Sequence, residues 1–234
     1  MKEIEKFLND LNFDEEKVNK GINKVNAKLK QYIDEKILPE YELNDGGHNS
    51  EHVKYVLKRA FELADGYEIN YDILYTCVCF HDVACHIDRD NHEVLSAQRA
   101  YEDDFLNGFF SIIEMKKIKE AIEDHRASSK IDPRSIYGKI VSSADRNDSV
   151  EQCLRRSYTY GKKLNPTFTD DEIFENAYQV LFDKFGISGY AKFYFKDKKY
   201  DNFLYDIRNL LKNKEEFINT QRKYIDKLRK KGKI

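Results

Sequence analysis

The sequence predicts an all-α protein, and three observations support this fold class. Only three prolines, at positions 39, 133 and 166, interrupt 234 residues that are rich in Lys, Glu, Leu, Ala and Ile. Apolar residues recur at the spacing of one helix face. No Asn-Gly or Asp-Gly pair joins two alternating runs, as a tight β-hairpin would require. We therefore expect eight to ten helices.

The expected helices are delimited by apolar stripes and by end signals. Ser111 with Glu114 and Thr169 with Glu172 have the spacing of capping boxes. Asp132, directly before a proline, is typical of an N-cap. The two clearest apolar stripes comprise Val18, Ile22, Val25, Leu29 and Ile33, then Val53, Val56, Leu57 and Ala60. The glycines expected to end helices are Gly66, Gly108, Gly161 and Gly186.

Two stretches towards the end of the chain have less regular patterns. Residues 190–200, YAKFYFKDKKY, fit either an extended strand or the start of a helix. Their aromatic rings can stack on a nucleobase, although such rings more often belong to a core. From about residue 222 the chain is strongly basic, and we expect this tail to fray.

Composition excludes several classes of protein. The chain carries 40 Lys+Arg against 42 Asp+Glu, a net charge of −2, so a nucleic-acid partner is not expected. The charge-free runs 73–81 and 105–113 are too short to cross a membrane, which needs about 20 apolar residues. The first ten residues alternate acid and base and do not resemble a signal peptide. Four cysteines without a paired framework fit a reducing compartment, so we expect a cytoplasmic protein.

Residues able to bind a metal ion occur beside apolar segments, mostly near the ends of expected helices. His52 lies in the first turns of one helix, and the pair His81-Asp82 ends the apolar segment YDILYTCVCFHD. His125 and Asp145 end two further segments. A single histidine at a helix end is more often a cap or a satisfied polar residue than a ligand. The repetition of the pattern favours a shared site.

Imidazole and carboxylate side chains together suit a divalent transition metal. Two histidines and two aspartates neutralise a 2+ ion and leave positions for water and a phosphate oxygen. His92 and His125 are then available for a second metal ion or as a proton donor to the leaving group. Without the ion, we expect Asp82 and Asp145 to raise each other's proton affinity in a poorly solvated pocket.

The order of these residues resembles the HD superfamily of metal-dependent phosphohydrolases. The family's first histidine matches His52 in HNSEHVKYVLKRA, its doublet matches His81-Asp82 in CFHDVACH, and its final aspartate matches Asp145 in IVSSADRND. The auxiliary histidines of some members match His92 and His125. The resemblance covers about residues 48–150. It implies an HD-like helical bundle over these residues. Outside the resemblance, we expect an N-terminal helical extension, residues 1–45, and a C-terminal helical segment, residues 151–234, packed on that core.

The resemblance also implies an activity. One or two ions of Mn, Fe, Co, Ni or Zn, held by His52, His81, Asp82 and Asp145, would activate water against a phosphate ester of a small, nucleotide-like metabolite. Asp82, His125 and Arg146 are the expected catalytic residues. Arg126, Lys54 and Arg155 are candidate phosphate contacts, and solvated surface charge is the alternative for each.

Two other functions remain open at this point. Relatives with this helical cage and extra histidines use two irons for oxygen chemistry, and full use of His92 and His125 as ligands would favour that activity. The third possibility is a metal-stabilised binding or regulatory module without turnover. The sequence also departs from two branches of the family. It has no counterpart of the Glu-Asp pair of ppGpp hydrolases and no Gly-Tyr-Pro signature of cyclic-di-GMP hydrolases, so both substrates are disfavoured.

Overall fold

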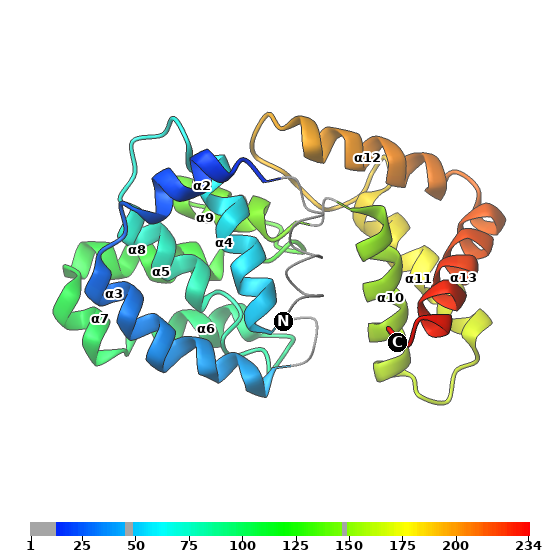
Figure 1. Cartoon of the computed structure of the whole chain (residues 1–234), viewed down its shortest axis with the longest axis horizontal. Helices are drawn as coiled ribbons and strands as arrows, with labels where there is room; N and C mark the ends of the chain where they lie inside the picture. Colours follow the sequence, from blue (N-terminus) through cyan, green and yellow to red (C-terminus); the bar gives the residue numbers. More distant parts are fainter. Residues whose placement is uncertain (1–12, 45–48, 147–148) are drawn as a thin grey trace. The chain divides into compact units, whose positions relative to one another are not determined.

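The computed structural model describes residues 13–44, 49–146 and 149–234, and Figure 1 shows their arrangement as helices joined by loops. Twelve α-helices are present in these ranges, more than the eight to ten expected, and no strand occurs in them. The all-α prediction is confirmed. No helix of the described ranges is long and apolar enough to cross a membrane. The predicted loop at Asp45-Gly46-Gly47 lies outside the described residues.

The chain forms two compact units. The first contains the described residues up to Asp145 together with 193–195, and the second contains 146–192 and 196–234. The helices of the first unit are α2 (Glu15–Ile22), α3 (Ala27–Tyr32), the π-helix η1 (Ile33–Ile37), the 3-10 helix η2 (Leu38–Leu43), α4 (Ser50–Ala64), α5 (Tyr71–Phe80), α6 (His92–Tyr101), α7 (Asp104–Phe109), α8 (Ile112–Glu123) and α9 (Ile136–Ala144).

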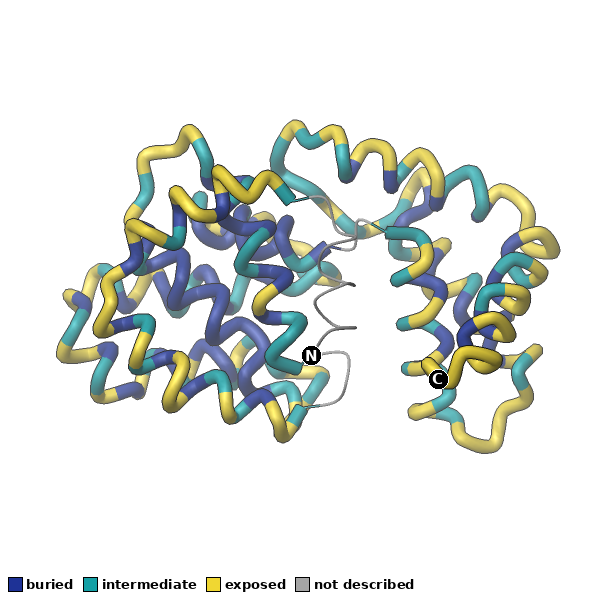
Figure 2. Tube along the Cα trace, viewed as in Figure 1, coloured by how far each residue is buried: buried dark blue, intermediate teal, exposed yellow. Residues whose placement is uncertain are grey.

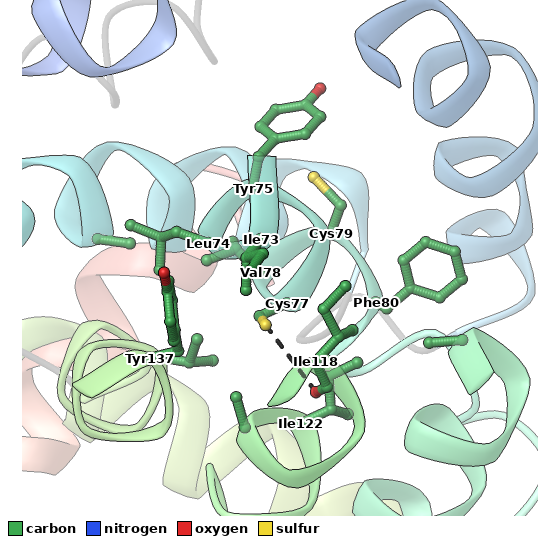
Figure 3. Close-up of a cluster of buried hydrophobic side chains, with 14 of the residues drawn as sticks. Ile73, Leu74, Tyr75, Cys77, Val78, Cys79, Phe80, Ile118, Ile122 and Tyr137 are labelled. Carbon is green, nitrogen blue, oxygen red and sulfur yellow. Dashed lines mark hydrogen bonds between the residues drawn. The ribbon is translucent and has the colours of Figure 1, made fainter. Parts of the chain in front are cut away.

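Helix α5 is the centre of the first unit. Nine of its ten residues are buried, as Figure 2 shows along its length, because α4, α6, α8 and α9 all pack against it. A helix that is apolar on every side is stable only when surrounded in this way. In Figure 3 the Cys77 Sγ atom points at the Ile118 carbonyl of α8, 3.9 Å away. None of the four cysteines forms a disulfide bond, and three of them are buried.

The N-terminal helices share this core. Leu29, Ile33, Ile37 and Tyr41 are fully buried in the same cluster as the side chains of α4, α5 and α8. Pro39 lies in the first turn of η2, where its missing N–H leaves no hydrogen bond unmade. Residues 25–41 are therefore an integral part of the unit that contains α5.

The second unit consists of α10 (Val150–Leu164), α11 (Asp170–Phe185), α12 (Lys198–Leu211) and α13 (Lys214–Lys230). Residues 190–197 contain no regular element, and α12 begins at Lys198, so the strand alternative for 190–200 is wrong. The basic tail predicted from residue 222 is helical as far as Lys230. A small cluster of apolar side chains joins α10, α11 and α13: Tyr158, Ile173, Phe174, Ile225 and Leu228.

The end signals were partly correct. Both capping boxes form, Gly186 caps α11, and Gly66 follows α4 with a φ of 87°. Ser135, and not Asp132, is the N-cap of α9. Gly161 lies inside α10 because it permits a close helix contact: a Cβ there would stand 3.2 Å from Ile173 Cγ2 of α11.

Candidate metal centre

The six predicted ligand residues all belong to the first unit, and each occupies an end of a helix. His52 is in the first turn of α4, which begins because the Asn49 side chain accepts from the His52 N–H at 3.2 Å. His81 and Asp145 are the C-cap residues of α5 and α9. His92 begins α6, and His125 follows the C-cap of α8. Figure 1 labels these five helices.

A first group of ligand atoms surrounds one oxygen of Asp82. Asp82 Oδ2 lies 3.6 Å from His52 Nε2 and 3.5 Å from His81 Nε2. The two imidazole nitrogens are 3.4 Å apart, and His52 Nε2 is 3.1 Å from Asp145 Oδ1. The four residues predicted to hold a metal ion are thus brought together. His52, His81 and Asp82 have the spacing of a metal-binding group.

A second group surrounds the other oxygen of the same carboxylate. Asp82 Oδ1 lies 3.2 Å from His92 Nε2 and 3.4 Å from His125 Nε2. The Nε2 atoms of the two histidines are 3.2 Å apart. These three side chains also have the spacing of a metal-binding group. Asp82 consequently belongs to both groups, with one oxygen in each.

Hydrogen bonds to backbone carbonyls orient three of the rings. The Nδ1 atom of His81 is 2.6 Å from the Val78 oxygen, and that of His125 is 2.6 Å from the Ile122 oxygen. The Nδ1 atom of His92 is 2.7 Å from the Arg89 oxygen. A carbonyl only accepts, so each Nδ1 carries the proton, and in a neutral imidazole Nε2 then holds a lone pair.

This orientation tests whether the residues suit a metal ion. In the second group two Nε2 lone pairs and a carboxylate oxygen face one another within 3.4 Å. Three acceptors at these distances repel unless a proton or a metal cation lies between them. Neutral imidazole and carboxylate are the ligands that divalent transition metals prefer, and Nδ1 bonding to a carbonyl is the usual support for such a ligand. The side chains therefore fit a metal ion.

The histidines also govern the acidity of the two carboxyl groups. Burial raises the pKa of Asp82, but His81, His125, His52 and His92 outweigh it and hold that pKa well below its usual value. The pKa of Asp145 is lowered in the same way by His52, against burial. Asp82 does raise the pKa of Asp145, as expected, but the hydrogen bond and charge of His52 outweigh this effect, so the net change is a decrease in proton affinity.

Two of the imidazoles respond to this environment in opposite directions. Burial lowers the pKa of His81 to about 4, so that this ring is neutral at physiological pH. Burial also acts against the charged form of His92, but the hydrogen bond and the charge of Asp82 outweigh it and raise that pKa. A neutral His81 is the form that binds a metal ion.

Two of the residues predicted to bind phosphate, Arg126 and Lys54, form ion pairs with glutamates in the structure. The Arg126 Nη1 atom is 3.1 and 3.0 Å from the two carboxylate oxygens of Glu93, and it also donates to the Asp90 carbonyl. Lys54 pairs with Glu51 at 2.8 Å on the surface of α4. Phosphate binding by Arg126 and Lys54 stays a prediction.

The remaining candidate residues contribute no ligand atom to either group. Arg146 Nε donates to the Lys192 carbonyl at 3.4 Å, and Arg155 is exposed on α10. His86, for which no role was predicted, lies with its Nδ1 3.2 Å from Asn44 Oδ1. The catalytic role of Arg146 and phosphate binding by Arg155 stay predictions.

The first unit is an all-α bundle in which α5 and the four helices packed around it bring together a His/Asp cluster that could hold a metal ion. The family is identified by its sequence model: residues 49–149 match the HD domain, and the chain therefore contains an HD domain over these residues. The resemblance inferred from the motifs is confirmed. An HD domain with such a cluster indicates hydrolase-type activity that depends on a metal ion. Neither the curated proteins nor the solved structures include a match to this chain.

Proposed function

We propose that this protein is a phosphohydrolase that binds two divalent transition-metal ions, one in each group of ligands around Asp82. The observation that carries the proposal is the convergence of imidazole lone pairs on both oxygens of one buried carboxylate. A structural histidine cap needs no such convergence, since its Nδ1 hydrogen bond alone satisfies the helix end. His52, His81, Asp82 and Asp145 would hold the first ion, and His92, His125 and Asp82 the second.

The chemistry follows from the ligands. A bound divalent ion supplies a Lewis acid that lowers the pKa of water towards neutrality and polarises a phosphoryl oxygen. Asp82 sets the spacing of the two positions, because its two oxygens are joined through one carbon. His81 and His125 are almost fully buried and exclude bulk water from one side of the site. The Asp145 side chain is 22% exposed, which favours substrate access from its side of the site.

The proposed substrate is a phosphate ester of a small, nucleotide-like metabolite. Two adjacent cations suit a phosphate monoester or diester, since they neutralise the charge on both the attacking and the leaving oxygen. We also propose a cytoplasmic location, because none of the four cysteines forms a disulfide bond, as is usual in a reducing compartment.

One observation favours a second candidate. His92 and His125 form a second group of possible ligands with Asp82. The use of both histidines as ligands would favour the diiron oxygenase. The two activities separate by metal: an oxygenase requires iron, whereas a phosphohydrolase also turns over with ions that do not change oxidation state.

The test is metal analysis combined with a substrate panel. The protein is purified with each of Mn, Fe, Co, Ni and Zn, and bound metal is counted by mass spectrometry before and after chelation. We expect about two ions per chain and hydrolysis of at least one nucleotide-type phosphate ester with Mn or Co. A stoichiometry near zero after metal supplementation contradicts the proposal. Two ions with no hydrolysis, but with oxygen uptake in the iron form, would support the oxygenase.

A further inference from the structure

The segment that precedes the HD domain reaches the metal centre. Helix η2 (Leu38–Leu43) and Asn44 lie outside the matched residues 49–149. Tyr41 is fully buried in the core. Its hydroxyl donates to the Cys79 carbonyl at 3.0 Å and accepts from the Asp82 N–H at 3.3 Å. On the other side of the same residue, Asn44 Nδ2 donates to the Asp82 carbonyl at 2.9 Å.

The Tyr41 contacts satisfy backbone groups that the end of α5 leaves open, and the Asn44 contact adds a second donor to the Asp82 carbonyl, which also accepts the Cys85 N–H at 3.1 Å. In a continuous helix the Asp82 N–H would donate to the Val78 carbonyl. That carbonyl instead receives the His81 N–H at 3.5 Å and His81 Nδ1 at 2.6 Å. The Tyr41 hydroxyl takes its place, bridging an N–H and a carbonyl that would otherwise be buried without partners. The chain can thus turn at the His-Asp pair with its backbone groups satisfied.

We infer that Tyr41 and Asn44 are positioning residues of the metal centre, which hold the Asp82 backbone from its two sides. The inference rests on the proposed function. Each oxygen of Asp82 belongs to one ligand group, so a rotation of its backbone displaces a ligand atom in both groups at once. The centre therefore depends on residues 38–44 in addition to the HD domain.

The experiment compares Tyr41→Phe with Tyr137→Phe in the full-length protein. Tyr137 is a matched control, because its hydroxyl accepts from the Asn70 N–H at 2.8 Å and so supports the opposite end of α5. Each substitution removes one hydroxyl that satisfies a backbone amide at an end of this helix. Mn²⁺ affinity is measured by titration of the metal-free protein, and the unfolding midpoint is measured in chelator.

We expect both variants to unfold earlier than the wild type in chelator. Only Tyr41→Phe should weaken Mn²⁺ binding, by about tenfold and at both positions, as is usual when a supporting hydrogen bond of a metal ligand is lost. Equal affinities for Tyr41→Phe and the wild type overturn the inference. Equal losses in Tyr41→Phe and Tyr137→Phe also overturn it, because the effect is then one of general stability.

A second variant covers the case in which Tyr41→Phe does not fold. Asn44→Ala removes the contact to the Asp82 carbonyl from a partly buried position, and we expect weaker Mn²⁺ binding there too. Unchanged Mn²⁺ affinity in Asn44→Ala counts against the inference. The outcomes also distinguish failure of the proposed function from failure of the positioning role. Wild-type protein that binds no Mn²⁺ overturns the proposed function, whereas full binding by the wild type and by both variants overturns only the positioning role.

Discussion

The ion pair between Arg126 and Glu93 leads to a prediction that separates two roles for the arginine. Each partner directly follows a proposed ligand of the second ion, His125 and His92 respectively. The ion pair therefore connects the start of α6 to the residues after α8. If this connection sets the distance between the His92 and His125 imidazoles, Arg126→Met should lower the metal affinity of the second position and leave that of the first unchanged. Methionine retains much of the side-chain stem while removing the charge.

The magnitude follows from the exposure and number of the contacts. The Arg126 and Glu93 side chains are 30% and 17% exposed, so the pair is intermediate between a surface and a buried ion pair. Such a pair contributes about 1 kcal/mol, and the hydrogen bond to the Asp90 carbonyl about as much again. We expect the free energy of unfolding to fall by about 2 kcal/mol in chelator. Loss of a supporting contact of this kind weakens metal binding about tenfold.

The assay is a Mn²⁺ titration that resolves the two positions, followed by kinetics on a hydrolysed substrate. The control is Lys116→Met, because Lys116 pairs with Glu120 of the same helix, α8, at 3.9 Å. Only Arg126→Met should bind one ion tightly and one weakly. If Arg126→Met instead keeps both Mn²⁺ affinities and only raises KM, the Arg126–Glu93 ion pair does not position the metal ligands. Arg126 is then the phosphate contact that the sequence predicted.

Three further predictions concern the ligands, the second unit and the thiols. His52→Ala should abolish retention of the first ion, whereas His86→Ala should leave metal content unchanged; equal losses in mass-spectrometric metal analysis would refute the ligand assignment. Although burial acts in the opposite direction, hydrogen bonds from basic and hydroxyl side chains lower the pKa of Asp170. Its stabilising effect is therefore present above the usual carboxyl pKa and lost as pH falls through the lowered value. Asp170→Asn should reduce the unfolding free energy by about 0.5–1 kcal/mol near pH 7, and in denaturant titrations this difference from the wild type should shrink as the pH falls below the usual carboxyl pKa. Burial raises the pKa of the Cys77 and Cys79 thiols, so both should resist alkylation at pH 8 until the protein is unfolded; rapid labelling of the native protein, followed by peptide mass spectrometry, would contradict this.

The sequence alone was sufficient for the fold class and for the motif residues. Helical periodicity and the capping boxes at Ser111 and Thr169 act over three or four positions, and both boxes form as expected. The order of His52, the pair His81-Asp82 and Asp145 was enough to indicate an HD domain, and the family match includes these residues. Such features depend on neighbours along the chain, which a single sequence displays directly.

Only the tertiary structure decided how the residues are grouped. Asp82 serves two ligand groups, Arg126 pairs with Glu93, and Tyr41 supports the end of α5. Apart from His81 and His92, these partners are thirty or more residues apart in the chain. Gly161 had the local signal of a helix end, yet the close contact with Ile173 of α11 keeps it inside a helix. The physical reason is the same in each case. The local sequence is compatible with several contact partners, and the packing of the whole core determines which of these contacts forms.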